Sequence, residues 1–216
     1  SMTHAELKTA IAGYLNRSDL TSTIDTFIDN VEAELNRKLR TKDMIVRATA
    51  VADAQYLSVP DDWLEAINVE ITSNDFSPLF QQSIESLDVY RKANNNLTGQ
   101  PVYYAMVDGT IELAPTPDVP YTLQLTYYGK INALSDTNAT NFVSVSNPDV
   151  YLYGALKHAS IYLMEDDRIA MFTQQFEKAL EEMRLAQEKA AFGKGSLIMR
   201  RKTYGTKQKR NYYYGN

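Results

Sequence analysis

The chain contains no cysteine and only two histidines, and these scarcities narrow what its 216 residues can do. Without cysteine there is no disulfide bond, no thiolate metal site and no cysteine nucleophile. No apolar run approaches the roughly 20 residues that a transmembrane helix requires. The opening Ser1-Met2-Thr3-His4 lacks the basic start and the apolar stretch of a secretion signal. We therefore expect a protein made in the cytoplasm, with no membrane partner.

The residues that could support catalysis do not form a recognisable set. His158 falls in the middle of an expected helix, where a lone histidine usually meets a backbone carbonyl or water, and His4 falls at a terminus expected to fray. Asp61 and Glu65 could act as the acidic pair of a hydrolase, which is the least favoured function. Asp61 and Asp62 are instead typical of a turn. The sequence thus predicts no catalytic residues.

Two further motifs resemble binding sites only superficially. The acidic run Glu165-Asp166-Asp167 is better explained as a helix start, because carboxylates stabilise a helix N-terminus and consecutive helix residues point in different directions. The segment Gly193-Lys194-Gly195-Ser196 lacks the spacing of a phosphate-binding loop and follows no strand. We expect neither a metal site nor a cofactor.

Two amphipathic helices are expected at the N-terminal end. Thr3 and Glu6 have capping-box spacing, which predicts a short helix that ends near Asn16. Ser18-Asp19 offers an N-cap for a longer second helix, which closes in the basic turn Arg37-Lys38-Arg40. Its apolar residues recur at steps of three and four: Leu20, Ile24, Phe27, Ile28, Val31, Leu35 and Leu39.

The pattern then changes to short strands. Six runs rich in β-branched and aromatic residues are expected strands: 46–51, 56–59, 66–71, 102–106, 110–113 and 121–128. Asp108-Gly109 predicts a tight hairpin, since this pair tolerates the positive φ of a type I′ turn. Residues 83–92 should form a helix that interrupts the strands. The spacing indicates one small antiparallel sheet.

Two more helices are expected after a polar loop over residues 132–146. Asn147-Pro148 predicts a helix start with a capping side chain, and residues 151–164 are apolar around much of their circumference. Asp166-Asp167 should cap the last helix, whose apolar stripe is long: Ile169, Phe172, Phe176, Ala179, Met183 and Ala186.

This order of elements predicts an α+β fold. Residues 1–43 and 147–190 should form a helical bundle from the N- and C-terminal helices, with residues 44–146 as an inserted small antiparallel β lobe. Residues 191–216 should form an extended C-terminal tail, here called the C-terminal arm.

Charge is distributed unevenly along the chain. Eight of the 22 basic residues lie from Lys189 onward, where there is no acidic residue. The preceding 188 residues hold 14 basic and 27 acidic residues, a formal charge of −13. An acidic body with a basic end is typical of a chain that carries an interaction segment.

The C-terminal arm combines cations with tyrosines: Arg200, Arg201, Lys202, Tyr204, Lys207, Lys209, Arg210, Tyr212, Tyr213 and Tyr214. A merely solubilising end seldom carries so many aromatics. The arm could bind nucleic acid, with cations on phosphates and tyrosines stacked on bases. It could equally dock on a protein, because Tyr and Arg dominate interface hot spots. The acidic body would repel DNA, which favours docking on a protein.

Three segments carry a resemblance to a known family, together with the long second helix. They are LSVPDDWLEAINVEI at 57–71, GQPVYYAMVDGTIELAPTPDVPYTLQLTYYGKINALSD at 99–136 and NPDVYLYGALKHASIYLMEDDRIAMFTQQFEKAL at 147–180. In this respect residues 3–190 resemble the head-to-tail adaptors (tail tubular protein A-like) of short-tailed bacteriophages. The middle segment is the most specific, with its Asp-Gly turn between two strands.

The resemblance implies a structural protein of the virion, made in the host cytoplasm. Such adaptors form a ring, usually of twelve copies, beneath the portal protein. The ring extends the channel through which DNA passes and offers a platform for the tail nozzle or tail tube protein. Family members commonly reach the portal with their C-terminal segment, which matches the C-terminal arm by position and composition.

Overall fold

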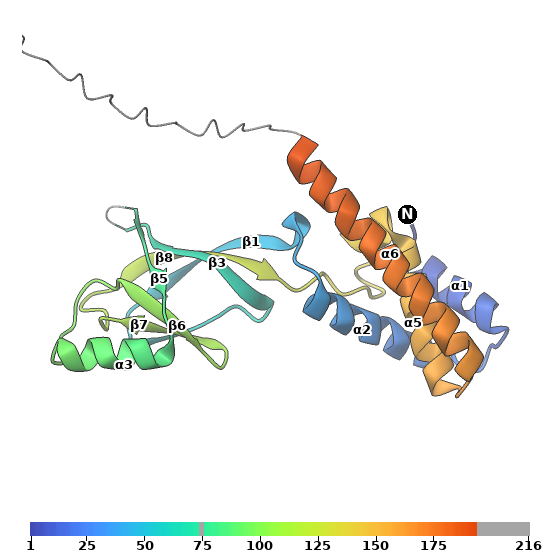
Figure 1. Ribbon diagram of the computed structural model, residues 1–216, viewed down its shortest axis with the longest axis horizontal. Helices are drawn as coiled ribbons and strands as arrows, with labels where there is room; N and C mark the ends of the chain where they lie inside the picture. Colours follow the sequence, from blue (N-terminus) through green and yellow to red (C-terminus); the bar gives the residue numbers. More distant parts are fainter. Residues whose placement is uncertain (74–75, 194–216) are drawn as a thin grey trace, which may run out of the picture.

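A computed structural model describes residues 1–73 and 76–193 of the chain. The molecule is elongated, with a β lobe at one end and a packed group of helices at the other (Figure 1). Helices from both ends of the chain build the helical part, and the strands lie between them in sequence. This confirms the predicted α+β fold, with a β lobe inserted into a helical bundle.

The N-terminal helices begin for different physical reasons. Helix α1 (His4–Leu15) has the predicted capping box, because the Thr3 hydroxyl accepts from the Glu6 amide and the Glu6 carboxylate accepts from the Thr3 amide. Helix α2 (Thr21–Lys38) has no side-chain cap, so the predicted cap at Ser18-Asp19 is wrong. The Asp19 carboxylate is held instead by the guanidinium of Arg17, at 2.6 Å from Nη2.

Three helices complete the bundle: α4 (Phe142–Ser146), α5 (Pro148–Tyr162) and α6 (Asp166–Gly193). Helix α4 lies in the segment predicted to be a loop, and Asn141 caps it. Pro148 is the first residue of α5, as predicted, but the Asn147 side chain makes no capping bond. Asp166 and Asp167 lie in the first turn of α6, where carboxylates favour the helix dipole.

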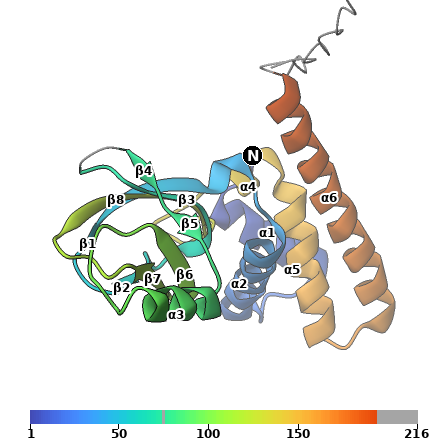
Figure 2. The same cartoon turned by 60° about the vertical axis from the view of Figure 1, so that its left-hand side comes forward.

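One hydrophobic core unites these helices. It contains most of the two predicted stripes, including Ile24, Phe27 and Val31 of α2 and Phe176 of α6. The α6 stripe is buried at Phe172, Phe176, Ala179 and Met183, whereas Ile169 is half-buried and Ala186 is exposed. The last turns of α6, after Met183, therefore project beyond the bundle (Figures 1 and 2).

The β lobe contains two four-stranded sheets rather than the single sheet predicted. The strands are β1 (Ile45–Ala52), β2 (Tyr56–Ser58), β3 (Trp63–Ile71), β4 (Ser77–Pro78), β5 (Phe80–Gln81), β6 (Tyr103–Val107), β7 (Thr110–Ala114) and β8 (Tyr121–Gly129). The first sheet has the order β1-β8-β3-β4 and the second β2-β7-β6-β5. All pairs are antiparallel except β5 with β6. The six predicted strands are confirmed, and β4 and β5 were missed.

The two sheets pack face to face, and helix α3 (Ile84–Ala93) covers the outer face of the second (Figure 2). Alternate residues of β8 are buried between the sheets, and Tyr127 among them stacks on Trp63 with ring centroids 4.6 Å apart. The β6–β7 turn is the predicted hairpin, since Asp108 has φ 34° and Gly109 φ 76°. Leu87 anchors α3 on Ala105 and Ala114.

Some residues predicted for the β lobe pack in the core of the helical bundle. Met44, Ile131, Leu134 and Val143 belong to the helical core, although they lie within the 44–146 range predicted for the β lobe. The short 3₁₀-helix η1 (Lys42–Met44) leads from α2 into β1. The loop and helix after β8 thus contribute to the helical core, not to the β lobe. The exact ranges of bundle, lobe and arm stay a proposal.

Candidate functional site

The predicted docking residues, from Arg200 to Tyr214, lie outside the described residues. Their expected role in binding a partner stays a prediction. The described residues do show how the body that carries the C-terminal arm is held together, and which of its surfaces are open to other proteins.

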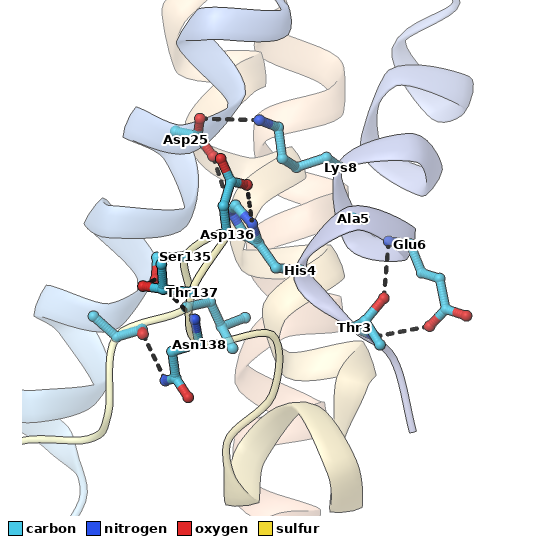
Figure 3. Close-up of polar contacts among 12 residues, drawn as sticks. Thr3, His4, Ala5, Glu6, Lys8, Asp25, Ser135, Asp136, Thr137 and Asn138 are labelled. Atoms are coloured by element: carbon cyan, nitrogen blue, oxygen red, sulfur yellow. Dashed lines mark hydrogen bonds and ion pairs between the residues drawn. The ribbon is translucent and has the colours of Figure 1, made fainter.

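The first polar cluster ties the N-terminus to α2 and to the loop before α4 (Figure 3). His4 is buried, and its Nε2 lies 3.0 Å from Asp25 while its Nδ1 lies 3.5 Å from Asp136. Lys8 Nζ donates to the other oxygen of Asp25 at 3.0 Å. The His4 amide also donates to the carbonyl of Ala139. The expectation that His4 sits at a frayed end is therefore wrong.

Electrostatics at this cluster favour the charged carboxylate. Burial alone would raise the pKa of Asp25, but the ammonium of Lys8 and the ring of His4 outweigh it and lower that pKa. The neighbouring loop is ordered by its own bonds, since the Asn138 side-chain amide donates to the Ala133 carbonyl at 2.8 Å (Figure 3). The cluster fastens the N-terminus rather than presenting a reactive group.

A second cluster joins α2, α5 and α6 around the carboxylate of Glu34. Lys157 donates to Glu34, His158 Nε2 lies 2.8 Å from it, and Lys38 Nζ lies 3.2 Å away. Lys38 also pairs with Glu177 of α6 at 2.8 Å. The partner of His158 is thus a carboxylate, not the carbonyl or water expected.

The same cluster lowers the pKa of His158. Burial lowers the pKa of His158, the positive charge of Lys157 lowers it further, and Glu34 only partly opposes both. Lys157 Nζ also lies 4.4 Å from the centroid of the Phe176 ring, a cation–π contact that links the cluster to the core. The histidine has no serine or nucleophile among its hydrogen-bond partners in the described chain.

A third buried group lies where the loop after β8 enters the bundle. The Glu32 carboxylate accepts from the amide of Leu134 at 2.8 Å and from the hydroxyl of Tyr151 at 3.1 Å. The Asn141 amide donates to the same tyrosine at 2.6 Å. Burial raises the pKa of Glu32, and burial with the nearby carboxylate raises that of Tyr151. This set fixes the loop to α2 and α5.

The acidic residues considered for a hydrolase also serve structure. Glu65 pairs with Arg40 at 2.9 Å and so links β3 to the end of α2. Asp62 accepts from the Tyr127 hydroxyl at 2.7 Å, and burial together with this carboxylate raises the pKa of Tyr127 to about 12. Among residues 1–73 and 76–193, no group of three or more potential metal ligands comes together. The contacts give the hydrolase hypothesis no support.

Large apolar side chains are exposed on both lobes of the molecule, and sequence reasoning missed them. At the α5–α6 turn, Ile161, Tyr162 and Met164 are exposed, Met164 to 86%. On the β lobe, the most exposed are Phe76, Phe80, Val89 and Leu97. Exposed apolar groups of this kind are typical of protein contacts, and Tyr and Met are enriched in interfaces. Hydrophobic periodicity alone does not distinguish such exposed apolar residues from those of the core.

No helix in the described ranges is long and apolar enough to cross a bilayer. The buried polar groups hold elements of the body together, and exposed apolar side chains are typical of proteins that contact other proteins. Residues 2–200 match the family described as SU10 adaptor protein, so the chain belongs to that family. It is therefore a bacteriophage adaptor and a structural component of the virion. None of the curated proteins compared with the chain matches it.

Proposed function

We propose that the protein forms a closed ring beneath the portal, extends the DNA channel and gives the phage tail its attachment platform. The observation that carries this proposal is membership of the adaptor family over nearly the whole chain. The finer assignment, to the tail tubular protein A-like adaptors of short-tailed phages with about twelve copies per ring, rests on the sequence segments described above.

The surfaces of the body support an assembly of this kind. A ring needs two different patches on each copy, because its contacts are heterologous. The α5–α6 turn and the β lobe carry separate exposed apolar groups, as such contacts require. The formal charge of −13 on the first 188 residues would give the ring an acidic lumen, through which DNA could slide without adhering.

The C-terminal arm is the proposed contact with the portal. Its seven cations, with Lys189 just before them, stand apart from the acidic body. Fully extended, 26 residues span on the order of 90 Å, so the arm could run along a neighbouring subunit.

Deletion of residues 191–216 tests the proposal. In the described part of the chain every core residue precedes this segment, so the truncated protein should still fold and keep the helical far-ultraviolet circular dichroism of the full chain. Co-sedimentation with purified portal should be lost, and native mass measurements should show the ring in the absence of portal. Portal attachment that survives the deletion would contradict the docking role of the arm.

A further inference from the structure

Strand β1 has one free edge. It pairs with β8 along its whole length, from Ile45 opposite Tyr128 to Ala52 opposite Tyr121, without a bulge. In an antiparallel pair, alternate residues direct their N–H and C=O groups away from the partner. Within residues 1–73 and 76–193, no second strand pairs with β1. Apart from the Ile45 amide, which donates to the Lys42 carbonyl, no loop or side chain bonds these groups.

The other sheet edges carry features that discourage pairing, whereas β1 does not. At the other edge of the first sheet, β4 is two residues long and contains Pro78, and β3, which β4 pairs only at Glu70 and Ile71, is interrupted by two register shifts. The edge strands β2 and β5 of the second sheet have three and two residues. Short edges, bulges and prolines are how proteins block unwanted pairing. The eight residues of β1 include no proline, no glycine and one charge, Arg47, while Ile45 and Val51 are 43% and 56% exposed. An edge this long and regular is suited to receive a strand.

The end of α6 shows which strand could reach it. Gln187 Nε2 donates to Asp43 Oδ2 at 3.0 Å, and Arg184 donates to the carbonyl of Lys38 at 2.7 Å. The last turns of α6 thus lie beside the residues that lead into β1, as both views show (Figures 1 and 2). Gly193, where α6 ends, is about 9 Å along the axis from Gln187 at 1.5 Å per residue.

The segment that follows has the length and composition of a matching strand. Residues 194–196 can span about 10 Å when extended, enough to return to the start of β1. Residues 197–204, Leu-Ile-Met-Arg-Arg-Lys-Thr-Tyr, contain no glycine or proline and number eight, as does β1. Gly195 and Gly205 bracket them. Arg200, Arg201 and Lys202 would give the enlarged sheet a charged outer edge, which protects it.

We infer that residues 197–204 pair with β1 of the same copy as the fifth strand of the first sheet. Lys207 to Tyr214 then remain to reach a partner. The inference deepens the proposed portal docking by giving the C-terminal arm an anchor on its own body. The pairing is tested on the isolated protein, without portal. A negative result would therefore leave the proposed portal attachment unaffected.

The absence of cysteine allows a direct test by disulfide trapping in the full chain. Thr49→Cys, at an exposed position of β1, is combined with one cysteine at Ile198, Met199, Arg200 or Arg201. Each arm position corresponds to one register of the pairing. Mild oxidation should give, for one of them, an intramolecular disulfide in a product of monomer mass. The control is Ile67→Cys, exposed on the bulged strand β3, with the same arm cysteines. Trapping no better than this control, or only between copies, would overturn the inference.

Hydrogen exchange gives an independent reading. In the full chain, Leu197→Gly, Ile198→Gly and Met199→Gly together remove strand-forming side chains but keep length and charge. The β1 amides that face the free edge should then exchange about tenfold faster or more, while the alternate amides bonded to β8 keep their protection. If the edge-facing amides of β1 exchange at the same rate in the variant as in the unaltered chain, the inference is overturned.

Discussion

Phe176 is one of the residues that pack α6 against the rest of the bundle. It is wholly buried, Lys157 lies over its ring, and a Cβ added at Gly154 of α5 would lie 3.0 Å from it. Phe176→Ala should lower the free energy of unfolding by about 3–5 kcal/mol, and Phe172→Ala by less, because Phe172 is slightly exposed. Thermal and urea denaturation measure both, with the exposed Glu182→Ala as control. A loss no larger than that of the control would show that the stripe faces something other than the core.

His158 should make stability depend on pH. Its folded pKa lies below the ordinary value of 6.5, so the folded state binds fewer protons than the unfolded chain. The resulting stabilisation is present above about pH 6.5 and is lost as the pH falls through the lower folded pKa. His158→Gln keeps a donor for Glu34 and removes the titration.

Urea midpoints between pH 7.5 and 5 test this. The wild type should lose more stability over that range than His158→Gln, because ionisation of Glu34 changes only at lower pH, where its pKa is held down by Lys157 and Lys38 against the effect of burial. Parallel curves for the two proteins would show that His158 does not carry the pH dependence.

Single residues were also where sequence reasoning failed most. The capping box at Thr3 and the Asp108-Gly109 turn were predictable because all their partners lie within three residues. The burial of His4 and the contacts of Glu32 and Glu34 were not, since these carboxylates meet partners more than 100 positions away. Short-range pattern carries no information about such pairs.

Among the elements, α4 is the one whose cap should matter most. Asn141 accepts from the Ser144 amide, and its own amide donates to Tyr151 and to the Asn132 carbonyl. Asn141→Ala should therefore cost about 1–2 kcal/mol. Asn147→Ala is a matched control, because that side chain makes no capping bond before α5. Equal denaturation midpoints for the two variants would contradict the assignment.

The strands show what period and length can reveal. Six were predictable because β-branched and aromatic residues recur in runs of four or more, clearest in β8, which alternates over nine residues. Strands β4 and β5 have two residues each and no pattern to detect. Division into two sheets escaped prediction for the same reason, since each short strand completes a sheet at its edge.

At the scale of the whole molecule, salt and side-chain type separate docking on a protein from binding to DNA. If the C-terminal arm docks on the portal, changing Tyr212, Tyr213 and Tyr214 together to serine should weaken attachment at physiological salt, because buried aromatic anchors are little screened. Binding of the intact protein to duplex DNA should stay at the nonspecific level of roughly 10⁻⁴ to 10⁻⁶ M or weaker.

The matched variant neutralises Arg200, Arg201 and Lys202 and leaves the tyrosines. A DNA-binding arm would lose most of its affinity in this variant, and the wild type would show a salt slope near −0.9 per phosphate neutralised. Tight DNA binding of that kind, without portal attachment, would overturn the adaptor proposal.

The insertion of the β lobe between the two halves of the bundle has a consequence during synthesis. Helix α6 begins at Asp166, about 130 residues after α2 ends at Lys38. At roughly 5–20 residues per second, a ribosome needs about 6 to 26 s to add them. For most of that interval Ile24, Phe27 and Val31 have been synthesised, while the residues of α5 and α6 that share their core have not. The nascent N-terminal helices are therefore a natural client for chaperones that bind exposed apolar surface, and the β lobe can fold before they are covered.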